Sequence, residues 1–287
     1  MRDGLVITML SVIPKHSTAR GMGWLSRIQL PRWMHRLVVR GFVWAYDIRL
    51  DECQLGIDDF NSLSEFFIRE LKPGLRPIDL SEVSLTSPVD GTVHSFGKIA
   101  SGKFAQSAER FGDVANLVGE AEDFVEPDPS LLAETYNDGQ YIIIYLSPQD
   151  YHRVHAHRGG ELSVVRYLPG RLWPVFPAAT RKIKSLFDRN ERLVFGINEE
   201  NRRTMIAMIG AFGVGRMTSS FLETISNTGR PGTDHRLTDV CVNKGEEIGR
   251  FELGSTVIIC TESDLEWQVS VGQKVCLGEI IAKFKDC

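Results

Sequence analysis

The spacing of hydrophobic positions changes near residue 75 and divides the chain into two parts. Upstream, apolar side chains recur at helical intervals, and the stretch Trp33–Ile48 combines them with arginines. Downstream, short runs rich in Ile, Val and Tyr are bounded by Gly, Pro or Asp, which is typical of strands. The runs are Tyr141–Leu146, Leu162–Leu168, Thr204–Ile209 and Thr256–Cys260. We therefore expect an α+β fold, with N-terminal amphipathic helices over residues 1–75 and a β-rich domain over residues 76–287.

The last helix of the N-terminal part has a start signal and a stop signal. Ser62 and Glu65 have the spacing of a capping box, which satisfies backbone N–H groups at the beginning of a helix. Apolar residues then recur at helical spacing as far as Leu71, and Lys72-Pro73-Gly74 ends the pattern. We predict a helix from Leu63 to Leu71.

Two glycine-containing stretches refine the expected architecture of the β-rich domain. SPVDGTV (87–93) and VGQKVCLGE (271–279) resemble the turns of lipoyl- and biotinyl-type barrel sandwiches, in which short strands pack as a flattened barrel. A carrier domain of that type presents a lysine flanked by Met or Asp at a hairpin tip, and neither stretch does. The resemblance therefore concerns a barrel-sandwich-like fold and not swinging-arm chemistry.

Composition excludes several classes of protein. Of the 287 residues, 43% are apolar and 24% are charged, which is ordinary for a folded soluble protein. The formal net charge of −4 provides no general attraction to nucleic acid, so we expect no nucleic-acid partner. The five cysteines are odd in number and form no CxxC pair, which favours reduced thiols in a cytoplasmic setting over a disulfide framework.

Charge is distributed unevenly along the chain. Residues 1–46 contain seven Arg and Lys against one Asp, a formal charge of +6, so the remaining residues carry −10. The apolar run Gly4–Ile13 is too short to span a bilayer, which takes roughly 20 residues. A helix over Trp33–Ile48 instead places aromatic rings beside arginines, as helices on anionic bilayers do. We predict peripheral membrane attachment through residues 1–48. The alternatives are ordinary packing of that helix on the rest of the protein, and a signal peptide ending near Ser17–Ala19.

Three places carry residues suited to catalysis. Asp90 lies in a glycine-containing turn, His155 follows the predicted strand Tyr141–Leu146, and Ser255 lies in a Gly-Ser-Thr turn ahead of another strand. Together they could form a triad of a serine nucleophile, a base that takes its proton and a carboxylate that orients the base. No GxSxG elbow surrounds Ser255, which argues against an α/β-hydrolase. A triad hydrolase, for example of lipids, is one hypothesis.

The histidines also permit a metal-site interpretation. His152, His155 and His157 are spaced H-x2-H-x-H, and on a strand the last two share a face. A closed zinc site needs a fourth ligand, and no cysteine or HExxH motif supplies an obvious one. We therefore expect no metal.

Gly254 offers Ser255 a second kind of chemistry. A glycine lets the backbone adopt conformations that other residues avoid, and it leaves its own carbonyl carbon open to attack by the neighbouring hydroxyl. Glycine-serine pairs are common, so this pair on its own carries little information about function.

Five motifs together resemble the phosphatidylserine decarboxylase family, in its long bacterial and mitochondrial-like class. They are LSEFFIRELKPGLRPID (63–79), SPVDGTV (87–93), YLSPQDYHRVH (145–155), NERL (190–193) and KGEEIGRFELGSTVI (244–258). The resemblance extends from near residue 60 to the C-terminus. LGST near the C-terminus, with DYHRVH and P-x-D-G upstream, is a highly specific combination.

The resemblance implies a pyruvoyl-dependent enzyme that makes its own cofactor. Members of the family are proenzymes that cleave themselves before the serine of LGST, here between Gly254 and Ser255. By resemblance, His155, oriented by Asp90, deprotonates Ser255, whose oxygen then attacks the Gly254 carbonyl. β-Elimination of the resulting ester, tautomerisation and loss of ammonia leave an N-terminal pyruvoyl group at residue 255.

The reaction implied by the resemblance is decarboxylation of phosphatidylserine to phosphatidylethanolamine, a step of phospholipid biosynthesis. The pyruvoyl carbonyl forms a Schiff base with the serine headgroup and takes up the electrons that CO2 leaves behind. His152 is implied to be the acid that returns a proton to the α-carbon, and an imidazole suits this task because its pKa lies near neutral. The processed enzyme, a carboxy-lyase, consists of a large chain, 1–254, and a small chain, 255–287. We expect the two chains to stay associated on the cytoplasmic side of the cell membrane.

The chain departs from the family pattern at one loop. After YLPG the family commonly has L-F-S-V-N, whereas this chain has LWPVF at residues 172–176. Pro174 and Phe176 thus replace a serine and an asparagine, which puts the contact to the headgroup carboxylate in question. Headgroup selectivity, acyl-chain preference and the choice between a monomer and a homodimer stay open. Two other hypotheses also stay open: the triad hydrolase, and a non-enzymatic barrel-sandwich binding module.

Overall fold

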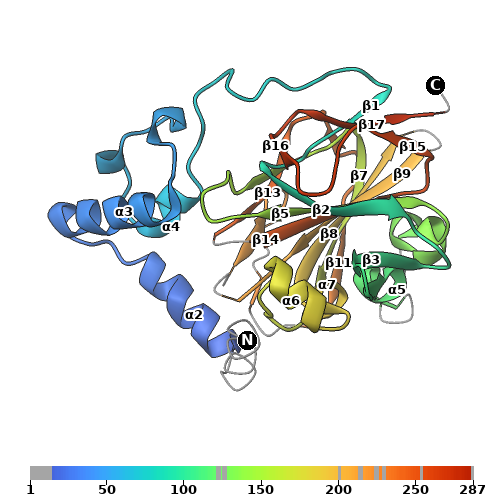
Figure 1. Ribbon diagram of the computed structural model, residues 1–287, viewed down its shortest axis with the longest axis horizontal. Helices are drawn as coiled ribbons and strands as arrows, with labels where there is room; N and C mark the ends of the chain where they lie inside the picture. The colour runs from blue at the N-terminus through green and yellow to red at the C-terminus, as the bar shows by residue number, and fades with distance from the viewer. Residues whose placement is uncertain are drawn as a thin grey trace.

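A helical region and a β domain follow one another along the chain (Figure 1). The computed structural model describes residues 15–120, 124, 128–199, 202–212, 216–222, 226–227, 231–252 and 255–285. We call residues 15–67 the helical region and residues 84–285 the β domain. The predicted α+β class is confirmed, while the boundary between residues 75 and 76 stays a prediction. The apolar run Gly4–Ile13 and the predicted cleavage residue Gly254 lie outside the described residues.

The helical region is built from short amphipathic helices around a small core. Its elements are α2 (Lys15–Ser26), α3 (Arg32–Tyr46), η1 (Leu50–Glu52), η2 (Ile57–Asp59) and α4 (Leu63–Phe67). The predicted helix Trp33–Ile48 is confirmed as α3. The core consists of Val39, Ile48, Cys53, Phe60 and Phe66. None of the helices in the part of the chain that the structure describes is long and apolar enough to cross a membrane.

Helix α4 is shorter than the sequence pattern predicts. Its start is confirmed, because the Ser62 hydroxyl accepts a hydrogen bond from the backbone N–H of Glu65 at 3.2 Å. The predicted end at Leu71 is wrong, because the helix stops at Phe67. Beyond it, Arg69 turns inward to donate to the backbone of the β domain, and Leu71 forms an isolated β-bridge. Tertiary contacts therefore override the local helical pattern.

The β domain is organised around one antiparallel sheet. In the described residues this sheet has nine strands in the order β11-β7-β8-β9-β14-β5-β2-β16, with β12 paired to β7. Their bounds are β2 (Gly91–Lys98), β5 (Gln140–Leu146), β7 (Gly160–Leu168), β8 (Arg192–Glu199), β9 (Arg202–Ile209), β11 (Thr233–Arg236), β12 (Cys241–Val242), β14 (Ser255–Thr261) and β16 (Lys274–Val275). The four predicted strands are confirmed as β5, β7, β9 and β14, each slightly longer than expected.

Smaller sheets and short helices surround the large sheet. One small sheet contains β1 (Ser84–Thr86), β17 (Ile280–Phe284) and β15 (Leu265–Trp267). A second contains β10 (Met217–Ser219), β13 (Glu247–Phe251) and β6 (Arg153–His155), and a third β3 (Lys103–Ser107) and β4 (Arg110–Asp113). The helices are α5 (Val114–Val118), α6 (Pro177–Lys182) and α7 (Leu186–Arg189), with 3-10 turns η4 (Pro129–Leu131) and η5 (Ala133–Tyr136).

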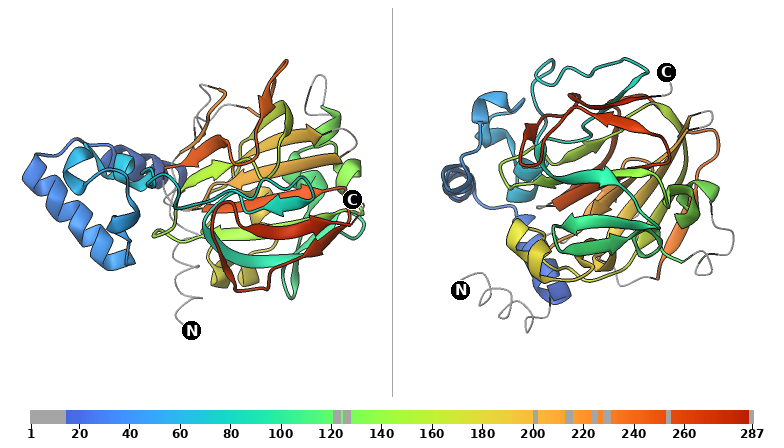
Figure 2. Two further views of the ribbon diagram at one scale, coloured as in Figure 1. Left: turned by 90° about the horizontal axis from the view of Figure 1, so that it is seen from above. Right: turned by 45° about the vertical axis from the view of Figure 1, so that its right-hand side comes forward.

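Strands β5 and β14 lie in the middle of the large sheet, and their sequences reflect this place. A strand covered on both faces needs apolar side chains at successive positions, which the runs YIIIYL and TVIIC supply. Figure 2 shows the helical region projecting from one side of the β domain. In Figure 1 the ends of β5, β13 and β14 lie on the side that faces α4, and this side carries the candidate site.

Candidate active site

Ser255 is the first residue of β14, at the centre of the large sheet. Its backbone lies opposite Leu146 of β5, and β14 pairs on its other side with β9. The chain reaches β14 from β13, which belongs to a different sheet and ends at Phe251. The predicted cleavage bond therefore lies in a short connection between two sheets, and its downstream residue begins a central strand.

His152 is completely buried beside both ends of that connection. Its carbonyl accepts a hydrogen bond from the N–H of Phe251 at 3.0 Å. Its ring Nε2 lies 3.1 Å from the carbonyl oxygen of Ser147, the residue after Leu146, and the ring stacks on Phe67 with centroids 4.0 Å apart. A carbonyl oxygen only accepts hydrogen bonds, so Nε2 carries the proton. Nδ1 is left as a buried lone pair with no partner among the described residues.

The surroundings of His152 keep its ring neutral. Burial, assisted by the positive charge of Arg69, lowers the pKa of His152 to about 3. The sequence predicts a pKa near neutral for His152, and burial explains why its pKa in the folded domain is lower. At neutral pH the ring is an unprotonated base and has to take up a proton before it can deliver one.

His155, at the end of β6, is also held in its neutral form. Its Nδ1 lies 2.8 Å from the carbonyl oxygen of Gly245, which fixes the ring proton on Nδ1. Nε2 is therefore the acceptor, and the hydroxyl of Tyr151 lies 3.3 Å from it, with the two rings stacked 5.7 Å apart. Burial lowers the pKa of His155, so at neutral pH Nε2 is an unprotonated acceptor, as a general base requires, and the Tyr151 hydroxyl is its present partner.

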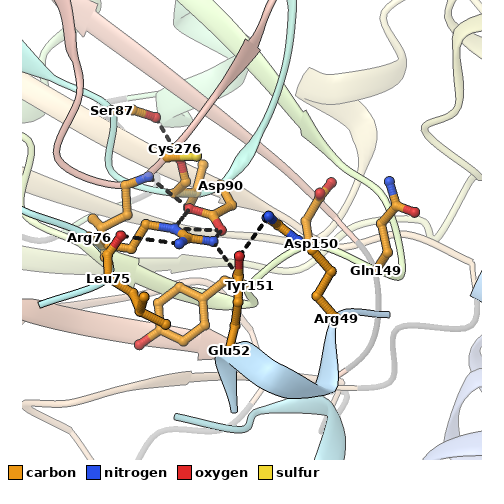
Figure 3. Close-up of polar contacts among 12 residues, drawn as sticks. Arg49, Glu52, Leu75, Arg76, Ser87, Asp90, Gln149, Asp150, Tyr151 and Cys276 are labelled. Atoms are coloured by element: carbon orange, nitrogen blue, oxygen red, sulfur yellow. Dashed lines mark hydrogen bonds and ion pairs between the residues drawn. The ribbon is translucent and has the colours of Figure 1, made fainter. Parts of the chain in front are cut away.

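Asp90 lies between β1 and β2 and is held by an arginine (Figure 3). Arg76 Nε lies 2.9 and 3.0 Å from the two carboxylate oxygens, and Nη2 lies 2.6 Å from one of them. The backbone N–H of Leu277 donates to the same carboxylate at 2.8 Å. Arg76 also contacts Glu52 of η1 at 2.8 Å. These charge-assisted contacts fix the carboxylate and connect it to the helical region.

The residue after Asp90 has to be a glycine because it packs closely against β5. A Cβ atom at residue 91 would lie 2.7 Å from both Ile144 Cγ2 and the carbonyl oxygen of Tyr145. The missing side chain lets β2 approach β5 closely, and β5 is also the neighbour of β14. The turn thereby carries Asp90 to the edge of the sheet region that contains Ser255.

Asp90 and His155 lie in one neighbourhood, although the hydrogen bonds described for their side chains go to other groups. The N–H of His155 donates to the carbonyl of Pro88, two residues before Asp90, at 2.9 Å. The charge of Asp90 acts to raise the pKa of His155, against the larger effect of burial. The predicted orientation of His155 by Asp90 stays a prediction.

Two cavities flank these residues. An apolar cavity of about 590 Å³ lies between the helical region and the β domain, and one of its walls is Leu146, the residue opposite Ser255. Further walls are Met22, Leu25, Val38, Phe42, Phe67, Pro174, Phe176 and Phe212. A polar cavity of about 340 Å³ lies beside Asp90 and is lined by Arg76, Asp150 and Tyr151 among others. No group of three or more metal-ligating side chains occurs within the described residues.

The comparison with known families is decisive. The family model for phosphatidylserine decarboxylase matches residues 63–283. This chain belongs to the phosphatidylserine decarboxylase family. The phosphatidylserine decarboxylase proenzyme of Myxococcus xanthus (strain DK1622) is 36% identical over 285 residues, which cover 98% of this chain and 99% of the relative. The proenzymes of Anaeromyxobacter sp. (strain K) and Brevibacillus brevis are 37% and 35% identical, over 97% and 99% of this chain and 98% and 100% of the relatives.

Membership of the phosphatidylserine decarboxylase family decides among the hypotheses drawn from the sequence. It confirms the resemblance, and with it the carboxy-lyase class. The triad hydrolase and the non-enzymatic binding module are set aside.

The surroundings of residue 255 fit the serine-derived pyruvoyl group of this family. The start of a strand that is paired on both sides fixes the backbone, and the cavity that reaches Leu146 is lined mainly by apolar side chains. His152 Nδ1 is a buried polar atom that lacks a partner among the described residues. A backbone fixed by two neighbouring strands and an apolar wall beside it suit a group that is held covalently at residue 255.

Three contacts of the site escaped the sequence reasoning. They are Arg76 on Asp90, Tyr151 on His155 and Phe67 on His152. All three residues lie inside the motifs that carry the family resemblance, which was the available signal. No local pattern in the sequence indicates which side chain each of these residues contacts, because the contacts form only when distant segments pack together.

Proposed function

We propose that this chain cleaves itself between Gly254 and Ser255 and then converts phosphatidylserine to phosphatidylethanolamine with a pyruvoyl group formed at residue 255. The observation that carries the proposal is the location of Ser255, at the start of a central strand beside an apolar cavity and a buried, neutral histidine. Full-length similarity to phosphatidylserine decarboxylase proenzymes supports the same reaction. The pyruvoyl carbonyl supplies an electron sink for the loss of CO2 from an α-amino acid headgroup.

Cleavage at this bond would leave the large chain, 1–254, and the small chain, 255–287, together. The small chain supplies β14, which is hydrogen-bonded to β5 and β9 of the large chain. It also supplies β17, which pairs with β1, and β16, which pairs with β2. Separating the chains would expose these ladders and the buried side chains of β14, so the two products form one domain.

His155 is the proposed base for self-cleavage. Its neutral ring has the acceptor at Nε2, which suits removal of the proton from the Ser255 hydroxyl. Burial lowers the pKa of His155, and the negative charges of Glu247 and Asp90 act against this effect and so favour the imidazolium ion that results. Arg76 and the N–H of Leu277 hold Asp90 in place for this task.

His152 is the proposed carrier of the proton in decarboxylation. The ammonium group of the substrate has to lose a proton, and we assign Nδ1 of His152, which has no partner among the described residues, as the acceptor, although burial opposes this uptake. His152 then returns that proton to the α-carbon after CO2 has left. Because burial makes the charged ring unfavourable, the return of the proton is driven strongly forward.

The helical region is the proposed membrane-binding surface. Trp24 and Leu25 on α2, and Trp33 and Trp44 on α3, are large apolar side chains that are mostly exposed. Several arginines accompany them on the same helices. We propose that residues 1–48 attach the enzyme peripherally to the anionic cytoplasmic face of the cell membrane, where its lipid substrate lies.

This chain has Pro174 and Phe176 where the family usually has a serine and an asparagine. Pro174 and Phe176 line the apolar cavity. We propose that they contact the lipid's apolar part or glycerol rather than the headgroup carboxylate. The double variant Pro174→Ser/Phe176→Asn should then leave cleavage intact. It should alter the KM for phosphatidylserine more than kcat.

The test of the proposed function follows both cleavage and product. Wild-type protein and Ser255→Ala are purified, separated by denaturing electrophoresis and assayed for phosphatidylethanolamine formed in phosphatidylserine-containing vesicles. We expect two chains and activity for the wild type, and one inactive chain for Ser255→Ala. Ser270→Ala, which changes an exposed serine of the same small chain, is the matched control and should behave as wild type. An uncut wild-type chain that forms phosphatidylethanolamine would overturn the proposal.

A further inference from the structure

Glu252 lies two residues before the scissile bond and has no role in the proposed chemistry. Strand β13 ends at Phe251, whose N–H donates to the carbonyl of His152. The N–H of Glu252 donates to the carbonyl of Arg216 at 3.0 Å. The backbone on the upstream side of the bond is thus held as far as residue 252.

The side chain of Glu252 is held as well. It is 13% exposed, and its two oxygens contact two arginines. Oε1 lies 3.1 Å from Nε of Arg216, and Oε2 lies 3.3 Å from Nε of Arg27. Burial raises the pKa of Glu252, and the charges of Arg216 and Arg27 and the side chain of Ser64 act against that rise.

The three partners come from three separate elements. Arg27 follows the last residue of α2, Ser64 belongs to α4, and Arg216 precedes β10. Helix α2 also carries the exposed Trp24 and Leu25. Glu252 is therefore a point at which α2, one of the proposed membrane-binding helices, is tied to the residues that precede the scissile bond.

An exposed ion pair between two surface side chains usually contributes little to stability. The pairs of Glu252 include Arg27 and Arg216, which are 42% and 25% exposed, and Glu252 Oε2 and Arg216 Nε have no hydrogen-bond partner among the described residues. Glu252 itself is only 13% exposed, is shared by two arginines and lies two residues before a bond whose reaction depends on geometry. A displacement of about 1 Å at a reacting centre can slow a reaction about 100-fold. The consequence of losing these contacts should therefore be seen in the rate of cleavage rather than in stability.

We propose that Glu252 is a positioning residue for self-cleavage, and that its contact with Arg27 makes the docked position of α2 part of the cleavage-competent structure. The inference rests on the proposed self-cleavage at Gly254–Ser255. It assigns to the helical region a second task besides membrane attachment, which is to hold the uncut segment in place.

The experiment measures how fast newly made chains are cut. Wild type, Glu252→Gln, Arg27→Gln and Arg27→Lys are made by cell-free translation, and the large and small chains are quantified over time by electrophoresis. We expect Glu252→Gln and Arg27→Gln to be cut about 10- to 100-fold more slowly. Arg27→Lys, which keeps the charge, should recover most of the rate. Arg20→Gln, at an exposed position of the same helix, should match wild type.

Two further readouts separate positioning from a merely structural role. Fully cut Glu252→Gln should have wild-type kcat per small chain and an unchanged melting temperature. The double variant Glu252→Gln/Arg27→Gln should be no slower than Glu252→Gln alone, because Glu252→Gln already removes the ion pair with Arg27. If Glu252→Gln fails to fold, the comparison of Arg27→Gln with Arg27→Lys and Arg20→Gln still tests the proposal.

Several results would overturn this inference. These are wild-type cutting of Glu252→Gln or of Arg27→Gln, or an equal slowing by Arg20→Gln. Ser255→Ala, translated in parallel, distinguishes this failure from failure of the proposed function. If Ser255→Ala stays whole while Glu252→Gln is cut normally, only the role of Glu252 is lost. If Ser255→Ala is itself cut, self-cleavage by Ser255 is wrong.

Discussion

The helical region and the β domain use their large apolar side chains in different ways. In the β domain Phe187, Phe195 and Phe251 are fully buried in one continuous core. In the helical region a small core leaves Trp33 65% exposed and Trp44 87% exposed. Contiguous exposed apolar surface marks a site of contact with another partner or phase. The β domain buries most of its large apolar side chains, with exceptions such as Phe111 and Val271, whereas the helical region leaves several of its tryptophans exposed, on the surface that we propose binds the membrane.

The ion pairs of the two regions also differ in how far they are exposed to solvent. Arg36 and Asp58 of the helical region form a half-exposed ion pair, of the kind that contributes little to stability. Arg76 and Asp90 form a nearly buried pair beside the candidate site. A change of charge in the helical region should therefore affect binding to a surface, while the same change beside Asp90 should affect chemistry.

The largest effect should follow from removing the groups proposed for self-cleavage. Asp90→Asn and His155→Ala should accumulate as uncut chain, because Ser255 loses its base or the charge that stabilises the protonated base. Electrophoresis of freshly purified protein measures the uncut fraction. His235→Gln, on the edge strand β11, is the control and should be fully cut. Complete cutting of His155→Ala would contradict the assignment.

The next effect separates the two histidines. His152→Ala should cleave normally but form phosphatidylethanolamine about 10²- to 10⁴-fold more slowly, since it lacks the proposed proton carrier. The rate is measured per small chain, so that incomplete cutting does not enter the result. If His152→Ala were the variant that stayed uncut, the division of tasks between His152 and His155 would be wrong.

The contrast in burial can be tested with two aromatic substitutions. Phe195→Ala in β8 should lower the free energy of unfolding by about 3–5 kcal/mol, because it leaves a cavity in the core. Trp44→Ala should change it by less than about 0.5 kcal/mol, because the side chain is exposed. Trp44→Ala should instead reduce the fraction of protein that co-sediments with anionic vesicles. Phe195→Ala should leave this fraction unchanged. The reverse pattern would refute the comparison of the two regions.

The smallest effect concerns pH and also belongs to the β domain. Burial lowers the pKa of His152, His155 and His157, whereas a histidine in the unfolded chain titrates near ~6.5. The unfolded chain therefore binds more protons in acid. Above the pKa of histidine in the unfolded chain, the buried rings cost no stability. The free energy of unfolding then decreases as pH falls toward the pKa of the rings in the folded protein, which is about 3 for His152.

For His152 alone we expect a loss of about 2 kcal/mol between pH 7 and pH 5. Urea unfolding of wild type and His152→Gln across this range measures the difference. Parallel pH curves for the two proteins would mean that His152 is not held neutral in the folded state.

Much of the fold could be predicted from the sequence because its strongest signals are local. The strands β5 and β14 are continuous apolar runs, and α3 has a long helical periodicity. The helix predicted to reach Leu71 failed where local and tertiary preferences conflict, since Arg69 contacts the β domain and ends the helix early.

The residues of the candidate site could be named from the sequence, but their contacts could not. Asp90, His152, His155 and Ser255 were found through motifs, whereas nothing local indicates that Arg76 holds Asp90 or that Arg27 reaches Glu252. Such pairs join segments that are distant in sequence and meet only when the strands take up their register. The burial that makes His152 neutral is likewise a property of the folded domain.

The intact mass of the small chain tests the central claim most directly. The purified wild-type protein should contain a chain of residues 255–287 that is lighter than the unmodified peptide by the mass of one ammonia molecule. Borohydride should raise that mass and abolish decarboxylation together, because both depend on the carbonyl at residue 255. An active protein whose Ser255 is unmodified and still joined to Gly254 would contradict the account.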